Sequence, residues 1–159
     1  APEAIERALA LGTPAAVVQL LDRHPRDCRA LAERLGVPHV RLPAALPDSP
    51  FHVFDIVRIP MWHEVGLWWP EHRALVVPEA VGTGPLFRPA DGVAAGIHLF
   101  LRPRPPKILR RYEPEHLLVG HGRSLHGPQT TAALRSAYDR TWRDLPGVLA
   151  RLPSAVRSR

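Results

Sequence analysis

Residues 116–126, with the sequence HLLVGHGRSLH, join a short apolar run to a histidine held between two glycines. The run 117–119 has the composition of a buried β-strand. Gly120 and Gly122 permit backbone angles and close approaches that a Cβ forbids. The pattern predicts that His121 stands at the end of a strand, where a sheet offers an imidazole to a metal ion or a substrate. A plain turn residue is the alternative interpretation of the same histidine.

Upstream of this stretch, strand and helix patterns alternate along the chain. A helix is predicted over residues 2–11, before an apolar run at residues 15–21 that is typical of a strand buried on both faces. Residues 26–35 then carry apolar side chains at helical spacing, and residues 37–42 resemble a second strand. Because a helix connects the two strands, we expect them to be parallel.

Downstream, the pattern changes to successive short strands. Strands are predicted over residues 53–59, 65–69 and 74–77, at a spacing that suits an antiparallel meander. A short helix at residues 105–112 precedes the strand at 117, and residues 130–142 form the last predicted helix. The order of these elements predicts an α/β fold with mixed sheets flanked by helices.

Length and composition limit the number of domains, the partners and the location that we expect for this protein. The chain has 159 residues with 45% hydrophobic content, which suffices for one globular domain over residues 1–159. The formal charge of +6 is spread over scattered arginines, so nucleic acid is not the expected partner. A single cysteine, Cys28, excludes an intrachain disulfide. With no signal-peptide pattern and no apolar run near the roughly 20 residues that span a bilayer, we expect a cytoplasmic protein that does not enter a membrane.

Four segments that follow predicted strands contain side chains able to bind a metal ion. They are residues 22–28, 62–64, 78–80 and 120–122. Ligands of open α/β sheets collect beyond the strand ends, so histidine, aspartate, glutamate and cysteine side chains from these loops are expected to converge on one site.

Three longer segments together resemble the metallo-β-lactamase fold family of metal-dependent hydrolases. Residues 17–37, VVQLLDRHPRDCRALAERLGV, are similar to the family's strand, metal-binding loop and helix, whose usual pattern is Thr-His-x-His-x-Asp-His. Residues 58–82 are similar to its Pro-Gly-His-Thr-x-Gly segment and its later Gly-Asp strand end, and residues 105–122 to its Gly-His-Gly loop. The resemblance spans nearly the whole chain and implies an αββα sandwich.

The first loop departs from the family pattern. Aligning Asp27 with the family aspartate puts Arg23 and Pro25 at the first two histidines and Cys28 at the third. Neither the guanidinium of Arg23 nor proline ligates zinc, so the resemblance implies that the first metal site is lost. A slip of one residue would instead bring His24 into a ligand position.

The remaining matches imply a second site with a single zinc ion. Its ligands would be Asp27, Cys28, Glu79 in place of the bridging aspartate, and His121, with His63 as a remnant of the first site. Such a zinc ion lowers the pKa of its bound water toward about 7, and Asp27 would act as the catalytic residue that orients this water for hydrolysis of an unknown substrate.

A non-catalytic interpretation stands beside the hydrolase. In it, no metal is bound, and the strand-end loops hold a small anionic ligand or a partner protein through Arg23, His24, Arg26, His63 and His121. Cys28 is then a small buried residue and Asp27 a helix cap.

The start of the sequence also departs from the family pattern. Family members usually begin with an N-terminal β-hairpin layer, whereas this sequence starts at the helix that follows. We therefore expect a reduced or N-terminally truncated domain with an exposed sheet edge, which favours pairing with a second copy of the chain.

Overall fold

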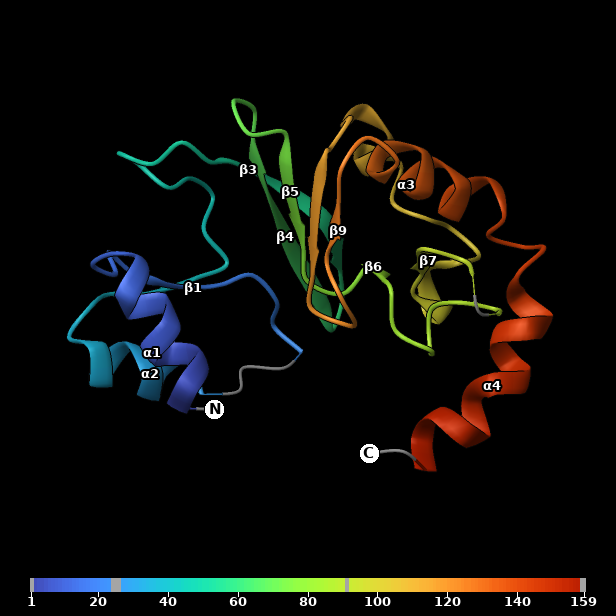
Figure 1. Ribbon diagram of the computed structural model, residues 1–159, viewed down its shortest axis with the longest axis horizontal. Coiled ribbons are helices and arrows are strands. Elements are labelled where there is room, and N and C mark those ends of the chain that lie inside the picture. The colour runs from blue at the N-terminus through green and yellow to red at the C-terminus, as the bar shows by residue number, and fades with distance from the viewer. Residues whose placement is uncertain (1, 24–26, 91, 158–159) are drawn as a thin grey trace.

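The N-terminal part of the protein folds as the predicted β-α-β unit. The computed structural model describes residues 2–23, 27–90 and 92–157 (Figure 1). Helix α1 (Pro2–Leu11) precedes strand β1 (Val17–Gln19), helix α2 (Cys28–Leu35) and strand β2 (His39–Arg41), and β1 and β2 pair in parallel as expected. Gly36 ends α2 in the left-handed conformation, at φ 65°, which glycine adopts without strain. The first strand is shorter than the predicted residues 15–21.

A five-stranded mixed sheet forms the centre of the molecule, in the order β3-β4-β5-β8-β9. Strands β3 (His52–Ile59), β4 (Trp62–Trp69) and β5 (Ala74–Val77) make the antiparallel meander that the sequence predicts. Strand β8 (His116–Val119) then pairs in parallel with β5, and β9 (Leu125–His126) pairs antiparallel with β8. The carboxyl ends of β5 and β8 therefore lie side by side at one edge of the sheet.

The prediction of a loop at residues 62–64 is wrong. Strand β4 already begins at Trp62, which pairs with Ile59 across a hairpin whose two connecting residues are Pro60 and Met61. Strands joined by so short a turn remain paired up to the turn, so residues 62–64 belong to the sheet.

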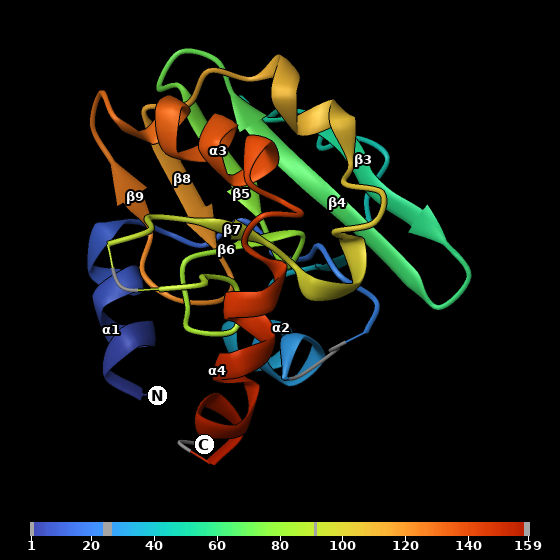
Figure 2. The ribbon, with the colours of Figure 1, turned by 90° about the vertical axis from the view of Figure 1, so that its right-hand side faces the viewer.

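The two faces of the sheet meet different parts of the chain. Leu75 and Leu117 point into the main core, where they join Leu134 and Tyr138 of helix α3 (Thr130–Asp139). The N-terminal unit lies on the opposite side of the sheet from α3 (Figures 1 and 2). Helix α3 ends at Asp139, earlier than the predicted residue 142, and a further helix, α4 (Leu145–Arg157), follows that the sequence pattern did not predict.

Short elements connect β5 to β8. They are β6 (Val81–Gly82), β7 (Gly96–Ile97), and the 3-10 helices η1 (Leu99–Leu101) and η2 (Lys107–Arg111). The helix predicted over residues 105–112 is thus present as the short 3-10 helix η2. The fold is of the mixed α/β class, and none of its described helices is long and apolar enough to cross a membrane.

Candidate functional site

Two loops that follow the parallel strands β5 and β8 are tied together by their backbones. Gly120 donates its N–H to the carbonyl of Pro78 at 3.1 Å, and Thr83 donates to the carbonyl of His121 at 2.9 Å. A Cβ on Gly120 would lie 2.3 Å from the Pro78 oxygen, so only glycine allows this approach. The glycine predicted to permit close packing beside His121 does so by joining the loop of His121 to that of Glu79.

A buried carboxyl group holds the loop after β5 by hydrogen bonds to its backbone. Glu64, on β4, is fully buried, and its Oε1 accepts hydrogen bonds from the backbone N–H groups of Glu79 at 2.7 Å and Ala80 at 2.8 Å. Its Oε2 accepts a hydrogen bond from the indole of Trp62 at 3.0 Å. Burial raises the pKa of Glu64 to about 7. This one side chain therefore fixes both the turn after β5 and the ring of Trp62.

Arg23 reaches the same place from the N-terminal unit. The segment before it is bonded to β4, because Val65 donates to the carbonyl of Leu20 at 2.8 Å and Asp22 donates to that of His63 at 3.1 Å. The Arg23 guanidinium then lies 4.2 Å from the centre of the Trp62 ring, within the range of a cation–π contact. Its Nη1 is 3.8 Å from Oε2 of Glu79.

Two histidines face the other oxygen of Glu79. The Nε2 atoms of His98 and His121 each lie 3.7 Å from Oε1 of Glu79. The backbone N–H of His98 is held by the carbonyl of Ala80 at 2.9 Å, and the Phe87 ring contacts both imidazoles, at centroid distances of 5.6 Å and 5.5 Å. Burial lowers the pKa of His98 to about 4, so its imidazole is neutral at neutral pH.

The four polar side chains of the site differ in how far they are exposed to solvent. The side chain of Glu79 is 5% exposed, whereas those of Arg23, His98 and His121 are 26%, 17% and 22% exposed. The carboxylate thus forms the floor, and the guanidinium and the two imidazoles form the reachable walls. A ligand here meets hydrogen-bond donors from Arg23 and an acceptor from Glu79.

The structure brings together three of the residues proposed from the sequence, namely Arg23, Glu79 and His121. His63 lies elsewhere: side chains alternate along β4, and while Glu64 points inward, Nε2 of His63 contacts Oδ1 of Asp55 at 2.8 Å. His63 is therefore held by a carboxylate of β3 and does not join Glu79.

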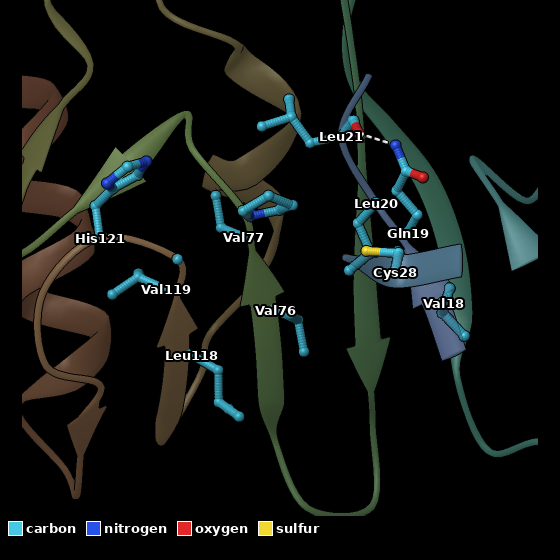
Figure 3. Close-up of a pocket in the computed structure, with 12 residues that line it drawn as sticks. Val18, Gln19, Leu20, Leu21, Cys28, Val76, Val77, Leu118, Val119 and His121 are labelled. Atoms are coloured by element: carbon cyan, nitrogen blue, oxygen red, sulfur yellow. Dashed lines mark hydrogen bonds between the residues drawn. The ribbon is translucent and has the colours of Figure 1, made fainter. Parts of the chain in front are cut away.

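The remaining candidates belong to the loop before α2. Asp27 is exposed at the N-cap position of α2, where its side chain makes no capping hydrogen bond. Cys28, the first residue of α2, is half-buried and lines the same cavity as His121 (Figure 3). His24, Pro25 and Arg26 lie outside the described residues, so their proposed roles stay predictions.

The described residues do not form a zinc site of the predicted kind. Zinc ligands surround the ion at about 2.0–2.3 Å. Within the described ranges, no three histidine, cysteine, aspartate or glutamate side chains are grouped so as to hold a metal ion. The carboxylate that would bridge to the metal already has the cation of Arg23 beside it. Zinc binding therefore stays a prediction.

Three contributors to the site were not singled out from the sequence: Trp62 and Glu64, which lie in the proposed segment 62–64 where only His63 was chosen, and His98. A signal existed for His98, because the apolar run 95–97 leads into a histidine just as the run 117–119 leads to His121. Glu64 was also detectable, as an acidic residue inside an apolar strand. That its carboxylate would hold the backbone of Glu79 required the tertiary structure.

Comparisons with known proteins do not assign the chain. No protein-family model matches it, and neither the curated proteins nor the solved structures contain a significant match. The functional interpretation therefore rests on the site itself.

Proposed function

We propose that this protein is a divergent member of the metallo-β-lactamase fold family, with that family's αββα sandwich, and that it binds a small anionic ligand at the site of Arg23 and Glu79. In this proposal the guanidinium of Arg23 supplies the positive charge that a metal ion supplies in hydrolases of the family. The resemblance in the loops at residues 17–37 and 105–122 supports the family, and the geometry of the site supports the binding function.

The observation that carries the proposal is the state of Arg23. Its Nη1 is buried and, among the residues described, makes no hydrogen bond. The Glu79 carboxylate oxygen, 3.8 Å from Nη1, is too far away for a hydrogen bond, so a ligand oxygen can supply the acceptor that this nitrogen lacks. The guanidinium is also oriented in advance by the Trp62 ring. Arginine held in this way suits carboxylate or phosphate groups.

Glu79 narrows the class of ligand. A bare anion next to its carboxylate would be repelled, whereas a ligand hydroxyl can donate a hydrogen bond to it. The site therefore favours a molecule that combines an anionic oxygen group, for Arg23, with a neighbouring hydroxyl, for Glu79. Hydroxycarboxylates and hydroxylated phosphate esters have this combination.

A single-zinc hydrolase is the competing proposal. Two imidazoles and one carboxylate are a zinc ligand set, and His98 and His121 both face Oε1 of Glu79. For zinc to bind, these three groups would have to close around the ion beside the positive charge of Arg23. Asp27 and Cys28 would then keep the roles that the family resemblance implies.

The partners and location are proposed on the same basis. We expect a small-molecule ligand, no nucleic acid partner, a cytoplasmic location and pairing of two copies through an exposed sheet edge. Light scattering after size exclusion tests the last point: a monomer at high protein concentration would contradict it.

The test of the proposed function is ligand binding combined with elemental analysis of protein purified without a histidine tag. We expect 2-hydroxybutanoate to bind in calorimetry, and Arg23→Gln to weaken binding roughly tenfold or more. Arg29→Gln is the matched control, because Arg29 is exposed on α2. Equal affinities in all three proteins would overturn the proposal. About one zinc per chain, lost in Glu79→Gln and His121→Ala, would favour the hydrolase instead.

A further inference from the structure

We infer that the ligand carries an apolar tail, and that this tail occupies the cavity between the N-terminal unit and the central sheet. The inference rests on the proposed function, because the head group of the same ligand binds at Arg23 and Glu79. It names the ligand class as amphiphilic hydroxycarboxylates with an alkyl chain of medium length.

The cavity has a volume of about 320 Å³ and lies between β1 and the strands β5 and β8. Val18 and Leu20 line it from the N-terminal unit, and Val76 and Leu118 line it from the sheet (Figure 3). Small-molecule pockets usually measure about 300–1,000 Å³, so this one is at the lower end. Its size suits one alkyl chain better than a large ring system.

The described lining of the cavity is mostly apolar, which favours an apolar occupant. Among the described residues that line it, none is aspartate, glutamate, lysine or arginine. The amide of Gln19 is already engaged, since Nε2 donates to the Leu21 carbonyl at 2.8 Å and Oε1 contacts Nε2 of His39 at 3.1 Å. Apart from the imidazole of His121, the described lining therefore offers an ionic group few side-chain partners to replace its water.

The cavity adjoins the proposed site at His121. This residue lines the cavity together with Pro78 and Gly120, and its Nε2 lies 3.7 Å from Oε1 of Glu79. Figure 3 places His121 at one end of the cavity, past the end of β8. A ligand whose head group contacts Glu79 and Arg23 can therefore extend its tail past the imidazole and between the two layers.

Chain length is the first measurement. Calorimetry compares 2-hydroxybutanoate with 2-hydroxyoctanoate, which share a head group and differ by four methylenes. Burial of each methylene is worth about 0.8 kcal/mol, which corresponds to an affinity gain of up to roughly fourfold per methylene. We expect the longer acid to bind at least about tenfold more tightly.

Variants locate the tail. Val76→Phe fills the cavity and should reduce the affinity for 2-hydroxyoctanoate to that for 2-hydroxybutanoate. Val53→Phe is the matched control, because Val53 is a half-buried valine of the same sheet that does not line the cavity. Leu118→Gln is a second variant: it leaves the volume nearly unchanged and makes the lining polar, so it should weaken only the longer acid.

Cys28 provides an independent readout, because it lines the cavity and is the chain's single cysteine. We expect 2-hydroxyoctanoate to slow the alkylation of Cys28 by iodoacetamide, and 2-hydroxybutanoate at the same occupancy to leave it unchanged. Protection by both acids alike would contradict an occupied cavity.

The outcomes separate this inference from the proposed function. If both acids bind equally and both depend on Arg23, the tail inference is overturned and the proposed function stands. If 2-hydroxyoctanoate protects Cys28 equally in the wild type and in Arg23→Gln, the cavity takes the tail but the proposed head-group site fails. If neither acid binds nor protects Cys28, both are overturned.

Discussion

Oε1 of Glu64 accepts a hydrogen bond from the backbone N–H of Glu79 at 2.7 Å, so a buried carboxyl group holds the residue that forms the floor of the proposed site. The same oxygen also binds the N–H of Ala80. The position of the Glu79 carboxylate therefore depends on Glu64 of strand β4. A ligand bound at Glu79 does not need to contact Glu64.

The first prediction concerns the pH dependence of stability. Burial raises the pKa of Glu64 from 4.5 to about 7, so the folded state binds its proton more tightly than the unfolded state. The stability that this group contributes is fully present below about pH 4.5 and is lost as the pH rises through about 7, by up to about 3 kcal/mol.

Urea unfolding of the wild type and Glu64→Gln tests this prediction, because other titrating groups are common to both proteins. The wild type should lose stability relative to Glu64→Gln between about pH 5 and pH 8. Parallel pH profiles would contradict a raised pKa of Glu64.

The second prediction concerns the glycine after His121. Gly122 has φ 99°, and a Cβ there would lie 2.3 Å from Oγ1 of Thr83. Gly127 has nearly the same φ, 97°, but open space around it. Gly127→Ala should therefore cost only the left-handed backbone strain of about 1–2 kcal/mol. Gly122→Ala should cost about 3 kcal/mol or more, because the clash adds to the strain. Equal losses in thermal or urea unfolding would show that the contact with Thr83 relaxes freely.

The third prediction concerns His98. Burial lowers its pKa to about 4, so the imidazole should stay neutral in the folded protein until the solution is strongly acidic. The His98 ring resonance, assigned with the variant His98→Gln, should be constant from about pH 8 to pH 6 and should titrate near pH 4. The corresponding stability is present above the unfolded pKa of about 6.5 and is lost as the pH falls toward 4. A midpoint near 6.5 in the folded protein would contradict the prediction.

The fourth prediction concerns Arg102, a buried arginine that holds two backbone carbonyls by hydrogen bonds. Arg102 is 1% exposed and donates to the carbonyls of Thr141 at 2.7 Å and Phe87 at 2.8 Å. Arg102→Met keeps an apolar stem but leaves both buried carbonyls without these donors, which should cost about 3 kcal/mol in urea unfolding. Arg104→Met, at an exposed position two residues away, should change stability by less than about 0.5 kcal/mol. Similar effects in both variants would mean that the two carbonyls find other donors.

The pattern of apolar residues along the sequence predicted most of the strands. The parallel pair β1 and β2, the meander β3 to β5 and the strand before His121 all follow from apolar periodicity and from glycine and proline at the ends of elements. The predictions failed where pairing overrides local signals. A proline such as Pro60 usually marks the end of a strand and the start of a loop. In the structure, Pro60 is instead one of the two residues that connect β3 and β4 in a hairpin.

The sequence by itself indicated that Glu79 and His121 each follow a strand, because an apolar run that ends in proline or glycine places the next polar residue just beyond the strand end; that the two strands are neighbours came from the tertiary structure. Only the tertiary structure decided which residues meet there. His98 and Arg23 approach from distant parts of the chain, whereas His63 points away, since the register of β4 turns Glu64 inward and His63 outward. A shift of one residue in that register would exchange the two, and the register is set by the pairing of β4 with β3 across their two-residue hairpin.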